Sequence, residues 1–220
     1  VLNAIIGSLY VAGGATILGL LVSIPVAIYI NMYLSGKNFI VNSLRIIFDV
    51  LFGIPSIVYG AFGFLIMVYF GIRASLLGGI LAVALLVIPI LVRTLDEVIR
   101  TVPRELRDAS LSLGATRWEM SKVILRQIRP GIFTAILLSF GRGIGDVASV
   151  LFTAGFSDNI PTSLHQPAAT LPLAIFFQLG SPVEEVQGRA YASALILTIV
   201  VLIITVLSSV LSKRFSKNSI

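Results

Sequence analysis

Five long apolar runs leave few folds open to this chain of 220 residues. A helix that spans the hydrocarbon core of a membrane needs about 20 mainly apolar residues. The runs that meet this length predict transmembrane helices at about residues 5–30, 50–71, 74–93, 131–154 and 190–212. Hydrophobic residues make up 57% of the chain and charged residues 12%, whereas soluble domains are about half apolar and about a quarter charged. We therefore predict an all-α polytopic membrane protein with five transmembrane helices.

Lysine and arginine gather on one side of these predicted spans. Such residues are enriched in short cytoplasmic loops, so we expect the loop of residues 100–130 in the cytoplasm. The loop of residues 155–188 then lies outside, and the C-terminus is cytoplasmic. The cytoplasmic basic residues would be Lys37, Arg45, Arg93, Arg100, Arg104, Arg107, Arg117, Lys122, Arg126, Arg129, Lys213, Arg214 and Lys217, against Arg73 and Arg189 outside.

The beginning of the chain leaves two explanations open. The predicted topology starts outside, and the first residue is Val1 rather than methionine. No basic stretch precedes the first apolar run, which argues against a secretory signal peptide. Either a sixth, N-terminal span precedes this sequence, or the chain has been processed.

Several kinds of chemical site are not expected in this chain. It has no cysteine and a single histidine, His165, which excludes disulfides and any cysteine-based or multi-histidine metal site. It also lacks the Gly-x-x-x-x-Gly-Lys loop that binds nucleotide phosphates. We therefore expect no metal, no cofactor and no catalytic site in this chain.

The predicted cytoplasmic loop carries the clearest local signals. It reads RTVPRELRDASLSLGATRWEMSKVILRQIRP, residues 100–130. Pro103 suits the first turn of a helix, and Gly114 suits the position just past a helix end. Thr116 with Glu119 three residues later forms a capping box, which begins a new helix. The loop is therefore predicted to fold as two short helices with a turn at Gly114.

Three functions fit such a basic loop. It could lie along the membrane and contact anionic lipid headgroups, or dock into a groove on a cytoplasmic partner protein. Its outline also matches a DNA-binding helix-turn-helix. The DNA interpretation is weak because both ends of the loop are tied to predicted spans, so no nucleic acid partner is expected.

The stretch RELRDASLSLGAT, followed by W and later by RPGI, resembles the cytoplasmic loop motif of type I ABC importer permeases, Glu-Ala-Ala and then Gly. Asp108, Ala109 and Ser110 stand at the Glu-Ala-Ala positions, and Gly114 stands at the Gly. Leu125-Arg126 departs from the Leu-Pro found later in that motif. In the family this loop sits in a cleft of the ATPase subunit. The resemblance therefore implies that ATPase coupling involves Glu105, Asp108, Ala109, Ser110, Gly114 and Ala115.

The same resemblance implies the fold and the partners. It implies a type I ABC importer permease fold, in which this chain forms half of a translocation pathway in a bacterial or archaeal cell membrane. A second, homologous permease, two ATPase subunits that bind ATP and an external binding protein would complete the importer. The remaining partner of the chain is membrane lipid.

Further stretches resemble one branch of this family, the permeases of phosphate importers. GIPSIVYG at residues 53–60 and TLP at 170–172 recur there. GRGIGDVASVLFTA at residues 141–154 resembles their Arg-x-x-Gly-Glu-Thr-Ala-Pro-Leu-Leu-Phe-Thr-Ala stretch, with Asp146 in place of Glu. Phosphate is the substrate that this resemblance implies. The alternatives are another oxyanion such as molybdate or sulfate, and an ion-driven secondary transporter.

Two charged residues lie inside the fourth predicted span. Arg142 lies eleven residues beyond Gly131, hence about 16 Å into the membrane. An arginine there costs about 2.5–3.5 kcal/mol on insertion scales. Asp146 follows four residues later, on the same face of a continuous helix. The two form either a buried pair that packs the bundle or an anion pathway in which Asp146 neutralises Arg142 at rest. Arg45 and Asp49 have the same spacing and predict an interfacial pair.

Overall fold

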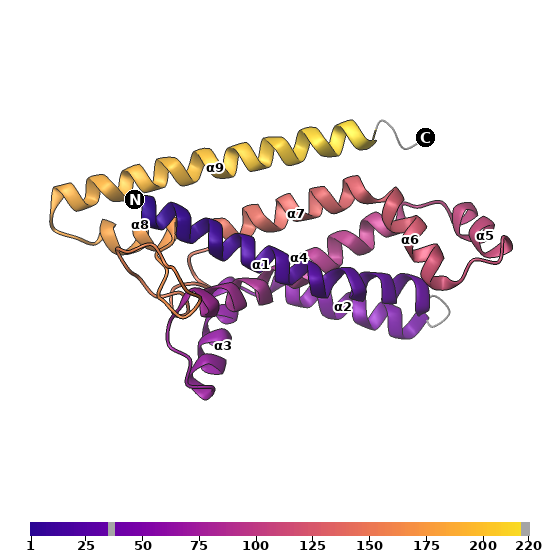
Figure 1. The fold of residues 1–220 in the computed structure, drawn as a ribbon, viewed down its shortest axis with the longest axis horizontal. Helices are drawn as coiled ribbons and strands as arrows, with labels where there is room; N and C mark the ends of the chain where they lie inside the picture. The colour runs from indigo at the N-terminus through magenta and orange to yellow at the C-terminus, as the bar shows by residue number, and fades with distance from the viewer. Residues whose placement is uncertain (35–37, 217–220) are drawn as a thin grey trace.

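Every regular element in the described part of the chain is a helix, which confirms the all-α prediction (Figure 1). The computed structural model describes residues 1–34 and 38–216, with the side chains of all except 38 and 211–216. The helices are α1 (Leu2–Ile28), its π-helical continuation η1 (Tyr29–Tyr33), α2 (Asn38–Gly53), α3 (Ser56–Tyr69), α4 (Leu76–Arg100), α5 (Arg104–Ser112), α6 (Arg117–Gln127), α7 (Arg129–Ile144), α8 (Leu171–Leu179) and α9 (Glu184–Ser216). Lys37 and Lys217, for which the sequence predicts a cytoplasmic position, lie outside the described residues.

The helices form an elongated bundle whose two ends differ (Figure 1). Helices α1, α2, α4, α7 and α9 run along its length. The short helices α5 and α6 lie at one end, which we call the α5–α6 end, and α8 lies at the other, the α8 end. Helix α3 leaves the bundle sideways, at 96° to α2. Each end therefore gathers segments that are far apart in the sequence.

Small residues let α1 pack closely on α4. Short side chains allow two helix backbones to approach closely, and such packing is one of the forces that associate helices in membranes. A Cβ added at Gly19 of α1 would lie 2.8 Å from Cδ1 of Leu91 on α4. The Ser23 hydroxyl also donates to the Ile88 carbonyl, at 3.2 Å. The buried face of α1 consists of Ala4, Gly7, Ser8, Val11, Ala12, Ala15, Thr16, Gly19, Ser23 and Ala27.

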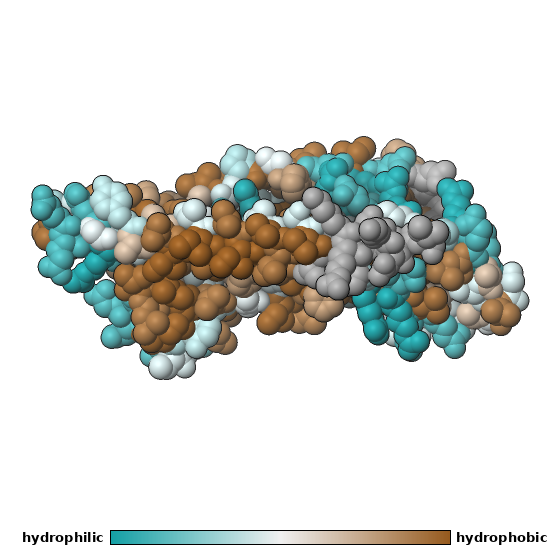
Figure 2. Space-filling view, turned by 90° about the horizontal axis from the view of Figure 1, so that it is seen from above, coloured by the Kyte–Doolittle hydropathy of each residue, from teal (hydrophilic) through white to brown (hydrophobic). Residues whose placement is uncertain are grey.

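Three helical segments are long and apolar enough to cross a membrane: Leu2–Tyr33, Leu76–Arg100 and Glu184–Val210. Two further pairs, α2 with α3 and α6 with α7, qualify if each bent pair counts as one span, which allows up to five. Figure 2 shows apolar side chains along α9, hydrophilic ones at one end of the molecule, and a mixture of hydrophilic and apolar ones at the other end. The five predicted transmembrane helices agree with this arrangement. The residues at which each of them enters and leaves the membrane stay a prediction.

The run expected to form one span at 50–71 falls on two helices instead. Helix α2 ends at Gly53, and Pro55 takes φ −58° and ψ 138° before α3 begins. A proline pushes the residue before it out of the helical region, here Ile54. The proline therefore separates the two helices and explains their sharp bend.

Candidate functional site

The turn at Gly114 has the geometry that the sequence predicts. Gly114 has a φ of +81°, a value that favours glycine because other residues lose energy there. Its N–H donates to the carbonyl of Leu111 at 2.9 Å, and the N–H of Ala115 donates to that of Ser110 at 3.1 Å. This pair of bonds is a Schellman motif, which satisfies the last carbonyls of α5.

The capping box that begins α6 is also confirmed. The Thr116 hydroxyl accepts a hydrogen bond from the Glu119 N–H at 3.3 Å, and the Glu119 carboxylate accepts from the Thr116 N–H at 2.8 Å. These bonds from the backbone and hydroxyl of Thr116 lower the pKa of Glu119 below its ordinary value. Glu119 is therefore ionised near neutral pH and keeps the N-terminus of α6 capped.

Helices α5 and α6 differ in what they leave accessible. No residue of α5 is buried, whereas Met120 and Ile124 of α6 are buried in the main hydrophobic core. At the turn between them, the Leu113 side chain is 89% exposed. The accessible surface of this loop is therefore α5, the turn and the outer face of α6, where Trp118 and Lys122 are exposed. The inner face of α6 attaches the loop to the bundle.

The structure gathers the six predicted coupling residues on this accessible surface. Glu105, Asp108 and Ala109 are exposed on α5 and lie at the i, i+3 and i+4 positions of one helix face. Gly114 is exposed at the turn, and Ser110 and Ala115 are half-buried beside it. Their positions agree with a docking surface, and their role in ATPase coupling stays a prediction.

Arg107 holds α5 against the end of α4, a contact that the sequence did not indicate. Its Nη2 donates to the Ile99 carbonyl at 2.9 Å. Burial, and then the nearby charge of Arg104, lower the pKa of the Arg107 guanidinium, while Asp108 opposes this shift. A guanidinium has so high a pKa that it stays protonated. Arg107 is thus a charged clamp at the base of the loop, and no local sequence pattern marks it.

The predicted pair of Arg142 and Asp146 is not formed. Both residues are described, and no ion pair joins them; α7 ends at Ile144, so Asp146 is not on the same helix. Three glycines between 141 and 145 lower helix propensity. The Asp146 carboxylate instead accepts hydrogen bonds from the N–H of Ser149, at 2.8 Å, and from its hydroxyl. Such a local bond competes with helix continuation.

Arg142 itself is exposed on α7. With Leu138 and Gly145 it forms an exposed stripe at i, i+4 and i+7, whereas Asp146 is only 9% exposed. The described part of the chain therefore leaves the guanidinium available to another molecule. A buried Arg142–Asp146 pair that packs the bundle is not present.

Arg45 and Asp49 do not pair with each other either. Arg45 binds Asp96 of α4, and Asp49 forms an ion pair with Arg93 of α4. The prediction that Arg45 and Asp49 pair with each other is therefore wrong. Each side chain binds a residue of the neighbouring helix α4 instead.

Comparison with known proteins agrees with this architecture. Residues 5–218 match the family model described as the binding-protein-dependent transport system inner membrane component. The chain belongs to this family. As an inner membrane component, it has the helices needed to span a membrane.

Relatives of this inner membrane component include several phosphate permeases. It is 37% identical to the phosphate transport system permease protein PstA of Yersinia pestis, over 95% of this chain and 71% of that protein. It is 36% identical to PstA of Xylella fastidiosa, over 92% and 71%, and 34% identical to PstA of Haemophilus influenzae, over 93% and 73%.

The fold is also found in a solved structure. A chain of the MetNI methionine ABC transporter, in inward-facing conformations, matches with a TM-score of 0.71 and 18% identity, over 97% of this chain and 95% of that chain. At this identity the match shows the fold alone. The prediction of a type I ABC importer permease fold is thereby confirmed.

Proposed function

We propose that this protein is the permease subunit of an ATP-driven importer of inorganic phosphate and forms half of its translocation pathway. The observation that carries the proposal is the 34–37% identity to PstA permeases along 92–95% of the chain. A PstC-like permease would supply the other half of the pathway. Two ATPase subunits would bind and hydrolyse ATP, and an external phosphate-binding protein would deliver the anion.

The exposed face of α5 and its turn is the proposed docking site for an ATPase subunit. Its accessibility supports this role, because α5 buries no residue in the described chain and Leu113 projects from the turn. An apolar side chain on such a projecting turn suits a groove on a partner protein. Glu105, Asp108 and Ala109 would line the same contact from one helix face.

Arg142 is the proposed anion-binding residue of the pathway. Two observations support this role. Arg142 is exposed on α7, and among the described residues it forms no ion pair with Asp146, which binds Ser149 instead. Guanidinium groups bind phosphate through paired N–H donors. Asp146 would act indirectly, by holding the turn after α7 through Ser149, rather than by neutralising Arg142.

The proposed topology places the α5–α6 end in the cytoplasm. Support comes from the loop itself, which carries basic residues from Arg100 to Arg129, as cytoplasmic loops do. Ser112→Cys on α5 and Ser163→Cys in the loop after α7 test it, since both positions are exposed and the chain has no other cysteine. On intact cells a membrane-impermeant thiol reagent should label only the second variant. Labelling of the first alone would invert the topology.

Uptake by the reconstituted importer tests the function. Proteoliposomes with the partner permease, the ATPase subunits and the binding protein should accumulate phosphate only when ATP is supplied. Arg142→Gln should abolish this uptake, whereas Arg73→Gln, at another exposed arginine, should preserve it. Uptake without ATP would favour a secondary transporter, and uptake of sulfate or molybdate instead of phosphate would identify a different oxyanion permease.

A further inference from the structure

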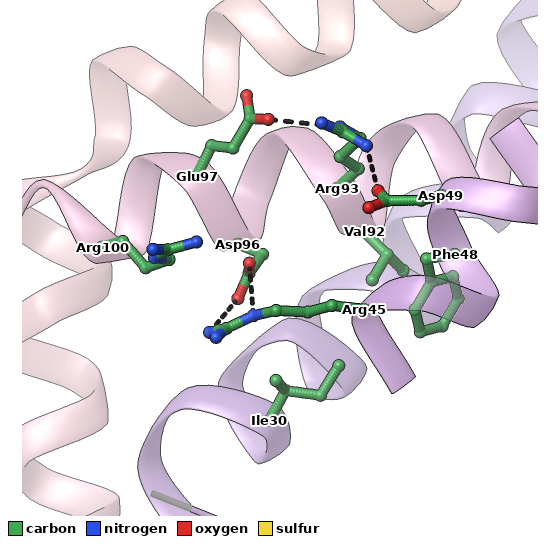
Figure 3. Close-up of a pocket in the computed structure, with 9 residues that line it drawn as sticks. All are labelled: Ile30, Arg45, Phe48, Asp49, Val92, Arg93, Asp96, Glu97 and Arg100. Atoms are coloured by element: carbon green, nitrogen blue, oxygen red, sulfur yellow. Dashed lines mark hydrogen bonds and ion pairs between the residues drawn. The ribbon is translucent and has the colours of Figure 1, made fainter. Parts of the chain in front are cut away.

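An ionic cluster around a buried carboxylate joins three helices near the α5–α6 end. Asp96 of α4 accepts two hydrogen bonds from Arg45 of α2, both at 3.0 Å, and one from Nδ2 of Asn31 in η1, at 2.7 Å. Figure 3 shows the Arg45 side chain reaching across from α2 to Asp96. Asp96 is only 6% exposed. Its carboxylate is thus desolvated, yet it is bonded through both oxygens.

Packing alone does not explain this cluster. The Arg45 side chain is still 29% exposed, but the Asp96 carboxylate is removed from water, at a cost that its partners only partly recover. A buried ionic group can instead serve to fix one arrangement of the elements that it joins. Here the partners lie 51 and 65 residues away in the sequence, so the cluster fixes how separate helices sit relative to one another.

Asn31 lies in the irregular part of the first helix. Tyr29 to Tyr33 form a π-helix, a rare conformation that often occurs at functional sites. Asn31 donates a second hydrogen bond to the carbonyl of Ala27, at 2.9 Å. The amide of Asn31 therefore ties the π-helical turn both to α1 and to Asp96.

Helix α6 contacts the cluster's surroundings directly. Nη1 of Arg117 donates to the Tyr33 carbonyl at 3.4 Å, and the guanidinium lies 5.9 Å from the centre of the Tyr33 ring. Met120 and Ile124 of α6 share one core cluster with Met32 of η1. The same core includes Ile99, three residues after Asp96. The docking loop is therefore attached to η1 through α6, and to the end of α4 through the bond from Arg107 of α5 to the Ile99 carbonyl.

We propose that Asn31, Arg45 and Asp96 are positioning residues that carry movement of the docking loop into the transport pathway. This inference rests on the proposed function, in which an ATPase subunit binds that loop. When the ATPase displaces the loop, η1 moves with it because α6 packs on η1. The end of α4 moves as well, because Arg107 of α5 binds the Ile99 carbonyl. Asp96 binds Arg45, so α2 and the attached α3 follow as part of the same unit.

A neighbouring ion pair provides a matched control. Glu97 follows Asp96 on α4 and binds Arg93 at 3.2 Å, but both side chains are well exposed. Exposed pairs of this kind contribute little. Glu97→Gln therefore removes a carboxylate from the same helix turn without touching the cluster.

The experiment compares phosphate uptake with ATP hydrolysis in proteoliposomes that contain the whole importer. Asp96→Asn should still assemble and hydrolyse ATP, but phosphate transported per ATP should fall about tenfold, which is within the usual range of coupling between sites. Glu97→Gln should keep the wild-type ratio. If Asp96→Asn keeps the wild-type ratio, this inference is wrong but the proposed function stands. If the wild-type importer shows no ATP-driven phosphate uptake, the proposed function is wrong and this inference falls with it.

A second variant keeps the test valid if Asp96→Asn does not assemble. Arg45→Met combined with Asp96→Leu leaves no stranded charge, so it should assemble even if the single variant does not. If this assembled variant hydrolyses ATP with little uptake, the cluster serves coupling. If it transports at the wild-type ratio, the cluster is only structural and the inference is wrong.

Discussion

The turn at Gly114 offers the sharpest single-residue test of docking. Gly114→Val places a β-branched residue at a φ of +81°, where a Cβ meets no atom within 4 Å. The cost is therefore confined to the backbone, about 1–2 kcal/mol for a left-handed conformation. If docking requires this turn, the affinity for the ATPase subunit should fall by about 5–30-fold, the factor that corresponds to this energy.

The matched control is Gly71→Val, in the turn between α3 and α4. Gly71 has a φ of +68° and is equally open, so its backbone cost is similar, but the length of α4 separates it from the loop. Titration of the ATPase subunit into the reconstituted permease should show the weaker binding for Gly114→Val only. Unchanged affinity in that variant, or an equal loss in Gly71→Val, would refute the reasoning.

Two local features make further predictions. Gly7→Ala directs a Cβ into the carbonyl oxygen of Ala169, so overpacking of about 1–3 kcal/mol should lower the melting temperature. The control Gly13→Ala, whose Cβ meets nothing within 4 Å, should not lower it. Equal melting temperatures for the two variants would contradict this packing. Thr116→Ala removes the N-cap of α6, a change that costs about 1 kcal/mol, and should speed hydrogen exchange at the first amides of α6. Because the pKa of Glu119 is lowered in the fold, its capping contribution is complete above the ordinary glutamate pKa of about 4.3 and is lost as pH falls through the lower folded value. Exchange protection in α6 that weakened already near neutral pH would show that the Glu119 carboxylate of the capping box does not set it.

Features set by neighbours in the sequence could be predicted. The Gly114 turn and the Thr116 capping box depend on residues within five positions of each other, and both were expected from sequence alone. Arg142 and Asp146 do not form the expected pair. A spacing of four residues brings two side chains together only within one continuous helix, and α7 ends between these residues.

Partners that come from other helices could not be predicted. Arg45 has Asp49 at a favourable spacing, yet it binds Asp96, which lies 51 residues away. Nothing in the local pattern distinguishes these carboxylates, because the choice depends on how α2 packs against α4. The exposure of α5 and the attachment of α6 are likewise consequences of packing, although both helices were expected.

The uncharged part of α9 is longer than a typical bilayer core is thick. Between Arg189 and Lys213 it has an uncharged stretch of 23 residues, about 35 Å long at 1.5 Å per residue, whereas a typical hydrocarbon core is about 30 Å. Only 11% of its apolar window is buried inside the protein. A helix longer than the membrane is thick relieves the mismatch by tilting. Because α9 lies on the side of the bundle and packs mainly on α7 and α8, its tilt can change with the lipid while the interface of α1 and α4 stays intact.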